Sequence, residues 1–239
     1  MVITGIQKEL EGLGDAAQAA ILQRFFKTGP GEYGAGDRFR GIRVPVLRGL
    51  AKKYQDVSQA EAGRLLQSPF HEDRLLALLL LIRHYDRGGP AAREEIHRYY
   101  LEHTRFVNNW DLVDASAPQL VGHYLADRPK ETLTRLAASR DLWERRIAII
   151  ATFYFIKQNA FAETLRMARV LLADPEDLIH KAVGWMLREV QKRETGVAEA
   201  FLHEHYRQMP RTMLRYAIER LPAARRQAYL KGTIGEPGK

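Results

Sequence analysis

Apolar residues recur at intervals of three and four along almost the whole chain, and this spacing is the feature that most restricts its fold. It is clearest in four segments, which begin at Leu10, Leu120, Ile147 and Val183. Such a period places the apolar side chains on one face of an α-helix. The sequence shows no sustained period of two and no Asn-Gly or Asp-Gly turn, so β-strands are not expected. The sequence therefore predicts an all-α fold.

Prolines and capping residues divide this pattern into about 11 to 13 helices of roughly 9 to 18 residues. Asp141 is expected to cap a helix that begins near Leu142, and Asp174 with Pro175 to cap and begin a later one. Pro118 is expected early in its helix or at a kink. Three further prolines suit helix starts: Pro129, Pro210 and Pro222.

Many short helices in succession predict an α-solenoid superhelix of HEAT-like helix pairs. Units of two helices would span about 35 to 45 residues, near the length of a HEAT repeat. An irregular helical bundle is the alternative, because the units resemble one another only weakly. Since a single domain can reach this length, we expect one HEAT-like repeat domain over residues 1–239.

Residues 28–42 interrupt the helical pattern with five glycines and one proline. We expect a loop there, too polar and too flexible to pack. Its glycine spacing matches neither a Walker loop nor a dinucleotide fingerprint, which leaves phosphate contact and a simple flexible connection both open. A flexible tail is expected over residues 232–239.

The chain carries 37 basic and 29 acidic residues, a net charge of +8, which favours a polyanionic partner such as nucleic acid or an anionic membrane surface. The most apolar run, residues 75–82, is too short to span a bilayer, so we expect a soluble cytoplasmic protein. The absence of cysteine excludes disulfides, thiolate metal sites and a cysteine nucleophile. No HExxH motif or G-x-S-x-G elbow is present, and we expect no metal and no cofactor.

All three tryptophans of the chain, Trp110, Trp143 and Trp185, stand beside charged residues, whereas tryptophan usually belongs to a core. On the helix predicted over 177–193, four residues share one face: Lys181, Trp185, Arg188 and Lys192. Another face carries the apolar residues Val183, Met186, Leu187 and Val190. The first face is a basic stripe that suits a phosphate backbone and a sugar or base, and equally a solvated cationic face with a half-buried tryptophan.

Trp110 and Asp114 are four residues apart, so a helix over 110–125 places a carboxylate beside an aromatic wall. Asp111 lies on another face and suits a capping or first-turn role. Near the C-terminus, Arg211 and Arg215 are one turn apart and would form a clamp for phosphates.

Five segments together resemble the DNA alkylation repair family, the AlkD-like HEAT-repeat DNA glycosylases: NNWDLVD, LWERRIAII, DLIHKAVGWMLREV, GIRVPVLRGLAKKY and HEDRLLALLLL. The resemblance covers most of the chain. It implies a right-handed superhelix with a basic concave face that holds duplex DNA. It also implies hydrolysis of the N-glycosidic bond of cationic N3- and N7-alkylated purines, as a step of base excision repair.

The resemblance also implies roles for single residues. Trp110 and Trp185 resemble the two tryptophans that flank the deoxyribose of the lesion, and Asp114 resembles the catalytic aspartate. Arg146 resembles an arginine near the lesion, and Arg188 a residue that binds the DNA backbone. We therefore expect double-stranded DNA with alkylated lesions as the partner of a monomer that acts at the nucleoid.

Two positions depart from the family pattern. Asn109 stands where the best-known glycosylases of the family have a second tryptophan, and residues 28–38 look longer and richer in glycine. Some branches of the family bind DNA without excising bases. A non-catalytic HEAT-repeat DNA-binding protein is thus the alternative function, and a scaffold for acidic proteins is a third.

Overall fold

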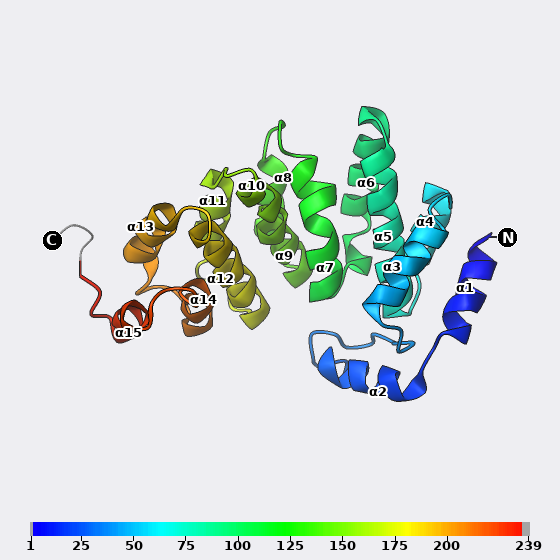
Figure 1. Ribbon diagram of the computed structural model, residues 1–239, viewed down its shortest axis with the longest axis horizontal. Helices are drawn as coiled ribbons and strands as arrows, with labels where there is room; N and C mark the ends of the chain where they lie inside the picture. The colour runs from blue at the N-terminus through cyan, green and yellow to red at the C-terminus, as the bar shows by residue number, and fades with distance from the viewer. Residues whose placement is uncertain (1, 236–239) are drawn as a thin grey trace. The chain divides into compact units, whose positions relative to one another are not determined.

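A computed structural model describes residues 2–235, and every regular element in them is a helix (Figure 1). The prediction of an all-α fold is confirmed. Within these residues, β-type pairing is limited to a single bridge between Arg38 and Phe70. No helix in this range combines the length and the hydropathy needed to cross a membrane. The last four residues of the predicted tail, 236–239, lie outside the described residues.

The chain divides into two compact units, Met1–Ser116 and Ala117–Lys239. The single domain expected over the whole chain stays a prediction. Unit 1 contains α1 (Val2–Gly12), α2 (Ala16–Phe25), α3 (Val44–Lys53), α4 (Gln59–Leu66), α5 (His71–Arg87), α6 (Pro90–Glu102), the 3₁₀ turn η1 (Thr104–Phe106) and α7 (Trp110–Ala117), which ends just past the division. Its centre is α5, which packs against α3, α4 and α6.

Unit 2 contains the π-helical turn η2 (Pro118–His123), α8 (Glu131–Ala137), α9 (Leu142–Ala151), α10 (Phe153–Lys157), α11 (Ala162–Val170), α12 (Asp177–Gln191), α13 (Thr195–His205), α14 (Arg211–Ala217) and α15 (Ala223–Lys231). In this unit α8 packs on α9, and α12 packs on both α13 and α14. Pairing of neighbouring helices within each unit is consistent with an α-solenoid of helix pairs. Some helices are shorter than predicted, since α10 has 5 residues and α14 has 7.

The predicted helix starts hold at some positions and fail at one. Asp141 caps α9 by accepting hydrogen bonds from the backbone of Trp143 and Glu144, as predicted. The cap predicted at Asp174 is wrong by two residues, because Glu176 is the N-cap of α12 and the helix begins at Asp177. The Asp174 carboxylate pairs with Arg145 at 2.6 Å and accepts a hydrogen bond of 2.9 Å from the backbone N–H of Glu176, the residue before α12. Prolines stand where starts or a kink were expected: Pro210 and Pro222 cap α14 and α15, Pro129 lies two residues before α8, and Pro118 begins the π-helical turn.

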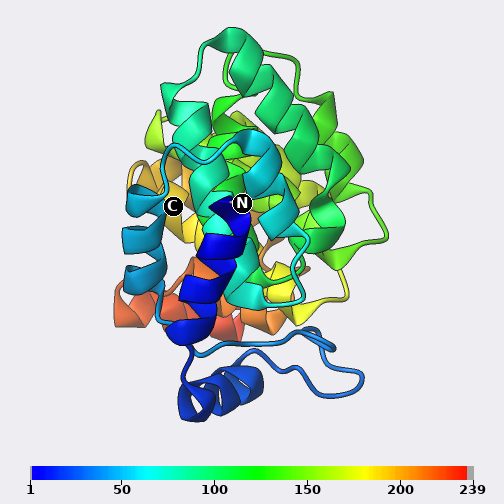
Figure 2. The same cartoon turned by 90° about the vertical axis from the view of Figure 1, so that its right-hand side faces the viewer.

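Residues 28–42 contain no helix, as predicted, and together with α2 they lie at one edge of unit 1 (Figure 2). The expectation that this loop does not pack is wrong for its second half, where Asp37, Phe39 and Ile42 are buried. Phe39 packs against Phe26, and polar contacts also hold this half of the loop. The loop meets charged side chains that α5 presents to it.

Candidate functional site

The first turn of α5 carries four charged or titratable side chains, and all four are buried: His71, Glu72, Asp73 and Arg74. We call this set the α5 clamp. Burying a charge costs free energy unless the charge is paired and hydrogen-bonded. The second half of the loop provides that pairing, so the clamp and the loop depend on each other.

Glu72 and Asp73 fix the loop backbone and one of its arginines. The Glu72 carboxylate accepts hydrogen bonds of 2.8 to 3.1 Å from three successive backbone N–H groups, those of Arg40, Gly41 and Ile42. The Asp73 carboxylate accepts two hydrogen bonds from the Arg40 guanidinium, at 2.7 and 3.0 Å. Both carboxylates therefore accept hydrogen bonds from the loop at both of their oxygens.

His71 lies between two carboxylates. Its Nδ1 is 3.0 Å from Oδ2 of Asp37 in the loop, and its Nε2 is 2.8 Å from Oδ2 of Asp111 in α7. Arg74 donates to the other oxygen of Asp37, and Asn109 Nδ2 donates to Asp37 Oδ2 at 3.3 Å. The loop, α5 and the start of α7 are thus joined by one buried polar network.

The network changes the acidity of its members. Burial disfavours the charged form of His71, but its hydrogen bonds with Asp111 and Asp37 outweigh burial and raise its pKa to about 9. Burial likewise works to raise the pKa of Asp37, yet the bonds with His71 and the charge of Arg74 bring it below its usual value. His71 is therefore an imidazolium at neutral pH, and it donates to both carboxylates.

Aromatic rings connect this network to Trp110. The Trp110 indole stacks on Phe26 with 5.2 Å between centroids and 17° between planes. The Phe26 ring is 5.0 Å from Phe39 and 4.9 Å from the His71 imidazole. Phe39 stacks on His71 at 4.6 Å. We call these four rings the Trp110 stack, which ends on the exposed Phe25 at 6.1 Å from Trp110.

Beside the stack lies a cavity of about 290 Å³, whose apolar lining includes Phe26, Phe39 and Leu75. The clamp residues His71 and Glu72 also line it, together with Asp111. The hydrogen bonds described above already occupy the nitrogens of His71 and the carboxylate oxygens of Glu72. The cavity therefore offers a ligand apolar contact more than hydrogen bonds.

The structure brings Trp110 and Asp114 together as predicted, one turn apart on α7. Both side chains are half-buried. Burial raises the pKa of the neighbouring Tyr100 hydroxyl, and the negative charge of Asp114 contributes to that rise. The predicted first-turn position of Asp111 is correct, but sequence reasoning missed its bond to His71.

On α12, the four predicted apolar residues, Val183, Met186, Leu187 and Val190, are fully buried. The opposite face is not the purely basic stripe that the sequence predicts, because acidic side chains pair with its lysines and its arginine. Lys181 pairs with Asp177 at 2.7 Å, and Lys192 pairs with Glu189 at 2.6 Å. Arg188 contacts the carboxylate of Glu219. The positive charge of this face is thus partly neutralised.

The other two tryptophans lie in contrasting places within unit 2. Trp185 is half-buried, donates from Nε1 to Glu189 at 3.0 Å and has Phe153 tilted beside it at 5.8 Å. Trp143 is buried and belongs to the core of α9. Charged sequence neighbours therefore indicated partial exposure correctly for Trp185 and wrongly for Trp143.

The remaining predicted DNA-binding residues also differ in their exposure to solvent. Arg146 is buried and donates to the backbone oxygen of Leu178 at 2.7 Å, which ties α9 to α12. Arg211 and Arg215 are exposed on α14, and Arg211 donates to the backbone oxygen of Leu230. Their predicted contacts with DNA stay predictions.

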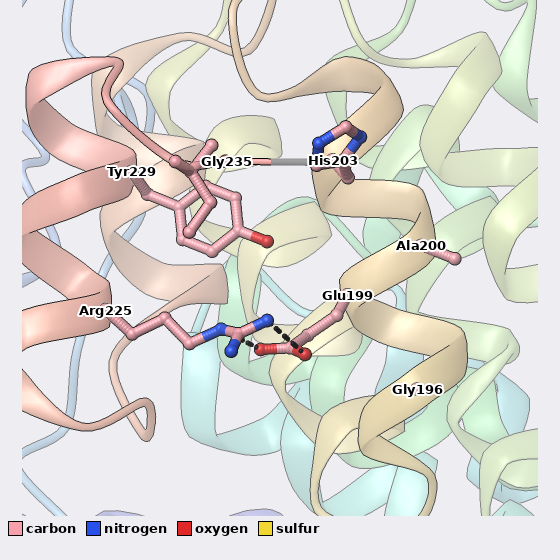
Figure 3. Close-up of a pocket in the computed structure, with 8 residues that line it drawn as sticks. Gly196, Glu199, Ala200, His203, Arg225, Tyr229 and Gly235 are labelled. Carbon is pink, nitrogen blue, oxygen red and sulfur yellow. Dashed lines mark hydrogen bonds and ion pairs between the residues drawn. The ribbon is translucent and has the colours of Figure 1, made fainter. Parts of the chain in front are cut away.

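A second cavity, of about 160 Å³, lies between α13 and α15 (Figure 3). Glu199 and Arg225 point toward each other across it and form an ion pair at 2.6 Å. Within residues 2–235, no cluster of His, Cys, Asp and Glu is arranged to hold a metal ion.

Sequence reasoning missed the α5 clamp and Asp37, although one signal was present. The apolar run that follows the clamp covers every side of the helix, which indicates a fully buried helix. Four polar residues in the turn before such a run cannot all face solvent. Acidic residues at a helix start suit the helix dipole, and this ordinary explanation of Glu72 and Asp73 concealed the network.

Two comparisons with known proteins give the same family description. A family model described as DNA alkylation repair enzyme matches residues 6–221. Among solved structures, a predicted DNA alkylation repair enzyme from Enterococcus faecalis is similar, with a TM-score of 0.68 and 19% sequence identity, over 88% of this chain and 97% of that one. At this identity the likeness shows the fold alone. No curated protein matches the sequence.

Proposed function

Because the chain belongs to the DNA alkylation repair enzyme family, we propose that it is a DNA glycosylase of base excision repair. Its substrates in this proposal are cationic N3- and N7-alkylated purines in duplex DNA, and it hydrolyses their N-glycosidic bond. The observation that carries the proposal is the arrangement on α7, where the Asp114 carboxylate and the Trp110 indole share one face and are both partly open to solvent.

The chemistry of such a substrate needs only these groups. An alkylated purine is already cationic, so it leaves without a general acid. As its bond to the sugar breaks, positive charge moves to the sugar as an oxocarbenium ion. A carboxylate near C1′ stabilises that ion and orients a water, and Asp114 has this role in the proposal. The electron-rich faces of Trp110 and Trp185 add cation–π attraction.

Basic residues of unit 2 hold the DNA backbone in the proposal. Those on α14, Arg211 and Arg215, are exposed and one turn apart. Three more belong to this set: Lys181, Arg188 and Lys192. Arg146, which is buried, lies near the lesion in the proposal rather than on the DNA backbone. The basic side chains of α12 form ion pairs with Asp177, Glu189 and Glu219. We therefore expect this face to bind phosphate only when those ion pairs break.

The proposal is tested by the release of 3-methyladenine or 7-methylguanine from methylated duplex DNA. We expect release by the unaltered protein and a loss of about 10² to 10³ in rate for Asp114→Asn, the typical effect of removing one preorganised electrostatic group. Asp127→Asn, at an exposed carboxylate, is the matched control and should keep the full rate. Equal background release from the unaltered protein and Asp114→Asn would refute the proposal.

In that event the second candidate, a non-catalytic DNA-binding protein of the same family, is favoured by the exposed pair on α14. It predicts binding that weakens with salt and in Arg211→Ala, without excision. In both cases we propose a monomer that acts on the nucleoid in the cytoplasm, which size-exclusion chromatography and DNA co-sedimentation would test.

A further inference from the structure

We propose that His71 is a positioning residue for Trp110, holding the start of α7 and the indole in place through Asp37, Asp111 and Phe26. The consequence for catalysis rests on the proposed function, in which Trp110 is a wall of the sugar site. His71 itself is buried and contacts Trp110 only through other side chains. It is therefore assigned no part in the reaction.

The first step of the argument concerns the backbone around Trp110. The residue before it, Asn109, donates to Asp37 at 3.3 Å, and the residue after it, Asp111, accepts from His71. Asp37 and His71 are hydrogen-bonded to each other at 3.0 Å. Both neighbours of Trp110 are thus tied to the same pair of residues, and that pair fixes the first turn of α7.

The second step concerns the indole ring. Trp110 lies nearly parallel to Phe26, whose other contacts include the His71 ring at 4.9 Å and Phe39 at 5.0 Å. A cation near the face of an aromatic ring attracts it. A protonated His71 therefore steadies the rings on which the indole rests, in addition to holding the backbone on both sides.

The third step concerns why histidine suits this position. The side chain must donate to carboxylates at both ends, and an imidazolium has one N–H at each end. Glutamine has its donors at one end only, so its carbonyl oxygen would face the other carboxylate. The charged groups that face His71 are Asp37 from the loop, Asp111 from α7, and Arg74 of its own helix through Asp37. Loss of the proton removes the His71 N–H donor from one of the two carboxylates.

The experiment measures the fluorescence of Trp110 alone, as the difference between a protein with Trp110 and the same protein with Trp110→Phe. In the unaltered background, we expect this emission to change as pH rises through about 9. With His71→Gln, we expect the emission to be shifted to the red and more open to acrylamide at pH 7, with no titration. Far-UV circular dichroism checks that each protein is folded.

Asp73→Asn is the matched control. Asp73 is a buried carboxylate of the same clamp, but it binds Arg40 and Ser68, and neither belongs to α7. We expect this variant to lose stability and keep the Trp110 emission. A folded His71→Gln protein with unchanged emission and unchanged titration would overturn the proposal. If His71→Gln does not fold, Asp111→Asn replaces it, with a smaller red shift expected and an unchanged emission again decisive.

Excision provides the second readout. A misplacement of about 1 Å can reduce a rate by about 10². We expect His71→Gln to slow single-turnover release to that extent with little change in the Kd for DNA. If the unaltered protein excises no base, the proposed function fails while the fluorescence still decides the role of His71. If excision occurs and His71→Gln releases base at the full rate, only the positioning proposal fails.

Discussion

Trp110 and Trp185 have the same predicted role and very different surroundings. Trp110 rests on a stack of rings whose far end is a buried imidazolium, and hydrogen bonds from a single network hold both of its neighbours in sequence. Trp185 has one tilted ring beside it and one hydrogen bond, to Glu189. A buried network surrounds Trp110, whereas Trp185 donates to the carboxylate of Glu189, which also pairs with Arg188 and Lys192.

This difference shows two ways of supporting an aromatic wall. A buried hydrogen-bonded network rigidifies its surroundings, but the loss of any member leaves the others uncompensated. A partly exposed ion pair contributes little to stability and responds to salt and to a charged ligand. We therefore expect changes near Trp110 to alter folding and geometry, and changes near Trp185 to alter affinity.

The largest effect is expected for Arg74→Met. Arg74 donates to Asp37 and to the backbone oxygen of Ser68, and its loss leaves Asp37 with one cationic partner fewer in a buried site. Breaking a buried pair in this way costs about 3 to 5 kcal/mol. Urea unfolding followed by circular dichroism measures the loss. Arg188→Met on α12 is the control and should cost less than about 1 kcal/mol, and an equal loss in both would contradict the comparison.

The second effect is a pH dependence of stability. Because the pKa of His71 is raised from 6.5 to about 9, its contribution is complete below pH 6.5 and is lost as pH rises through about 9. We expect the free energy of unfolding to fall over this interval, by on the order of 3 kcal/mol. Urea titrations at several pH values measure the slope.

His71→Gln should remove that slope. His97→Gln, at another buried histidine of unit 1, should keep it. A slope that survives in His71→Gln would assign the titration to another group.

How far the sequence predicted these two regions follows from the kind of pattern each contains. The α12 face could be predicted because helix periodicity fixes which residues share a side, and the buried set from Val183 to Val190 is as expected. Asp177 and Glu189 stand on the same helix and could have been predicted to pair, whereas Glu219 comes from another part of the chain. Periodicity carries no information about such long-range pairs.

The Trp110 region was predicted only within α7. The pairing of Asp37 with His71 joins residues 34 apart, and that of Asn109 with Asp37 joins residues 72 apart. A glycine-rich polar loop is ordinarily exposed, so its burial depends on partners that only the fold brings near. The two departures from the family pattern, Asn109 and the loop, proved to be in contact.

A third prediction tests that contact between loop and stack. A Cβ at Gly34 would overlap the backbone oxygen of Phe26 and approach Asn109 Nδ2 to 3.4 Å. Gly34→Ala should therefore displace the ring beneath Trp110 and cost about 1 to 3 kcal/mol. Gly196→Ala on α13 has only the Glu194 side chain nearby, at 3.5 Å, and should be neutral or stabilising. Thermal unfolding of the two variants distinguishes the sites, and a neutral Gly34→Ala would show that the loop is free to move.

The smallest effect is expected at Glu189, and it bears on affinity rather than stability. Glu189→Gln keeps an oxygen that accepts from the Trp185 indole and removes the charge that neutralises Lys192 and Arg188. If the α12 face binds DNA, its affinity should rise a few-fold and the salt dependence should steepen by about one phosphate contact. Stability should change by less than about 1 kcal/mol.

Glu131→Gln, which removes an exposed charge on α8, gives the same net charge and should leave the salt dependence unchanged. Fluorescence anisotropy titrations with duplex DNA at several salt concentrations compare the two, and equal gains would mean that net charge alone, rather than the α12 face, sets the affinity.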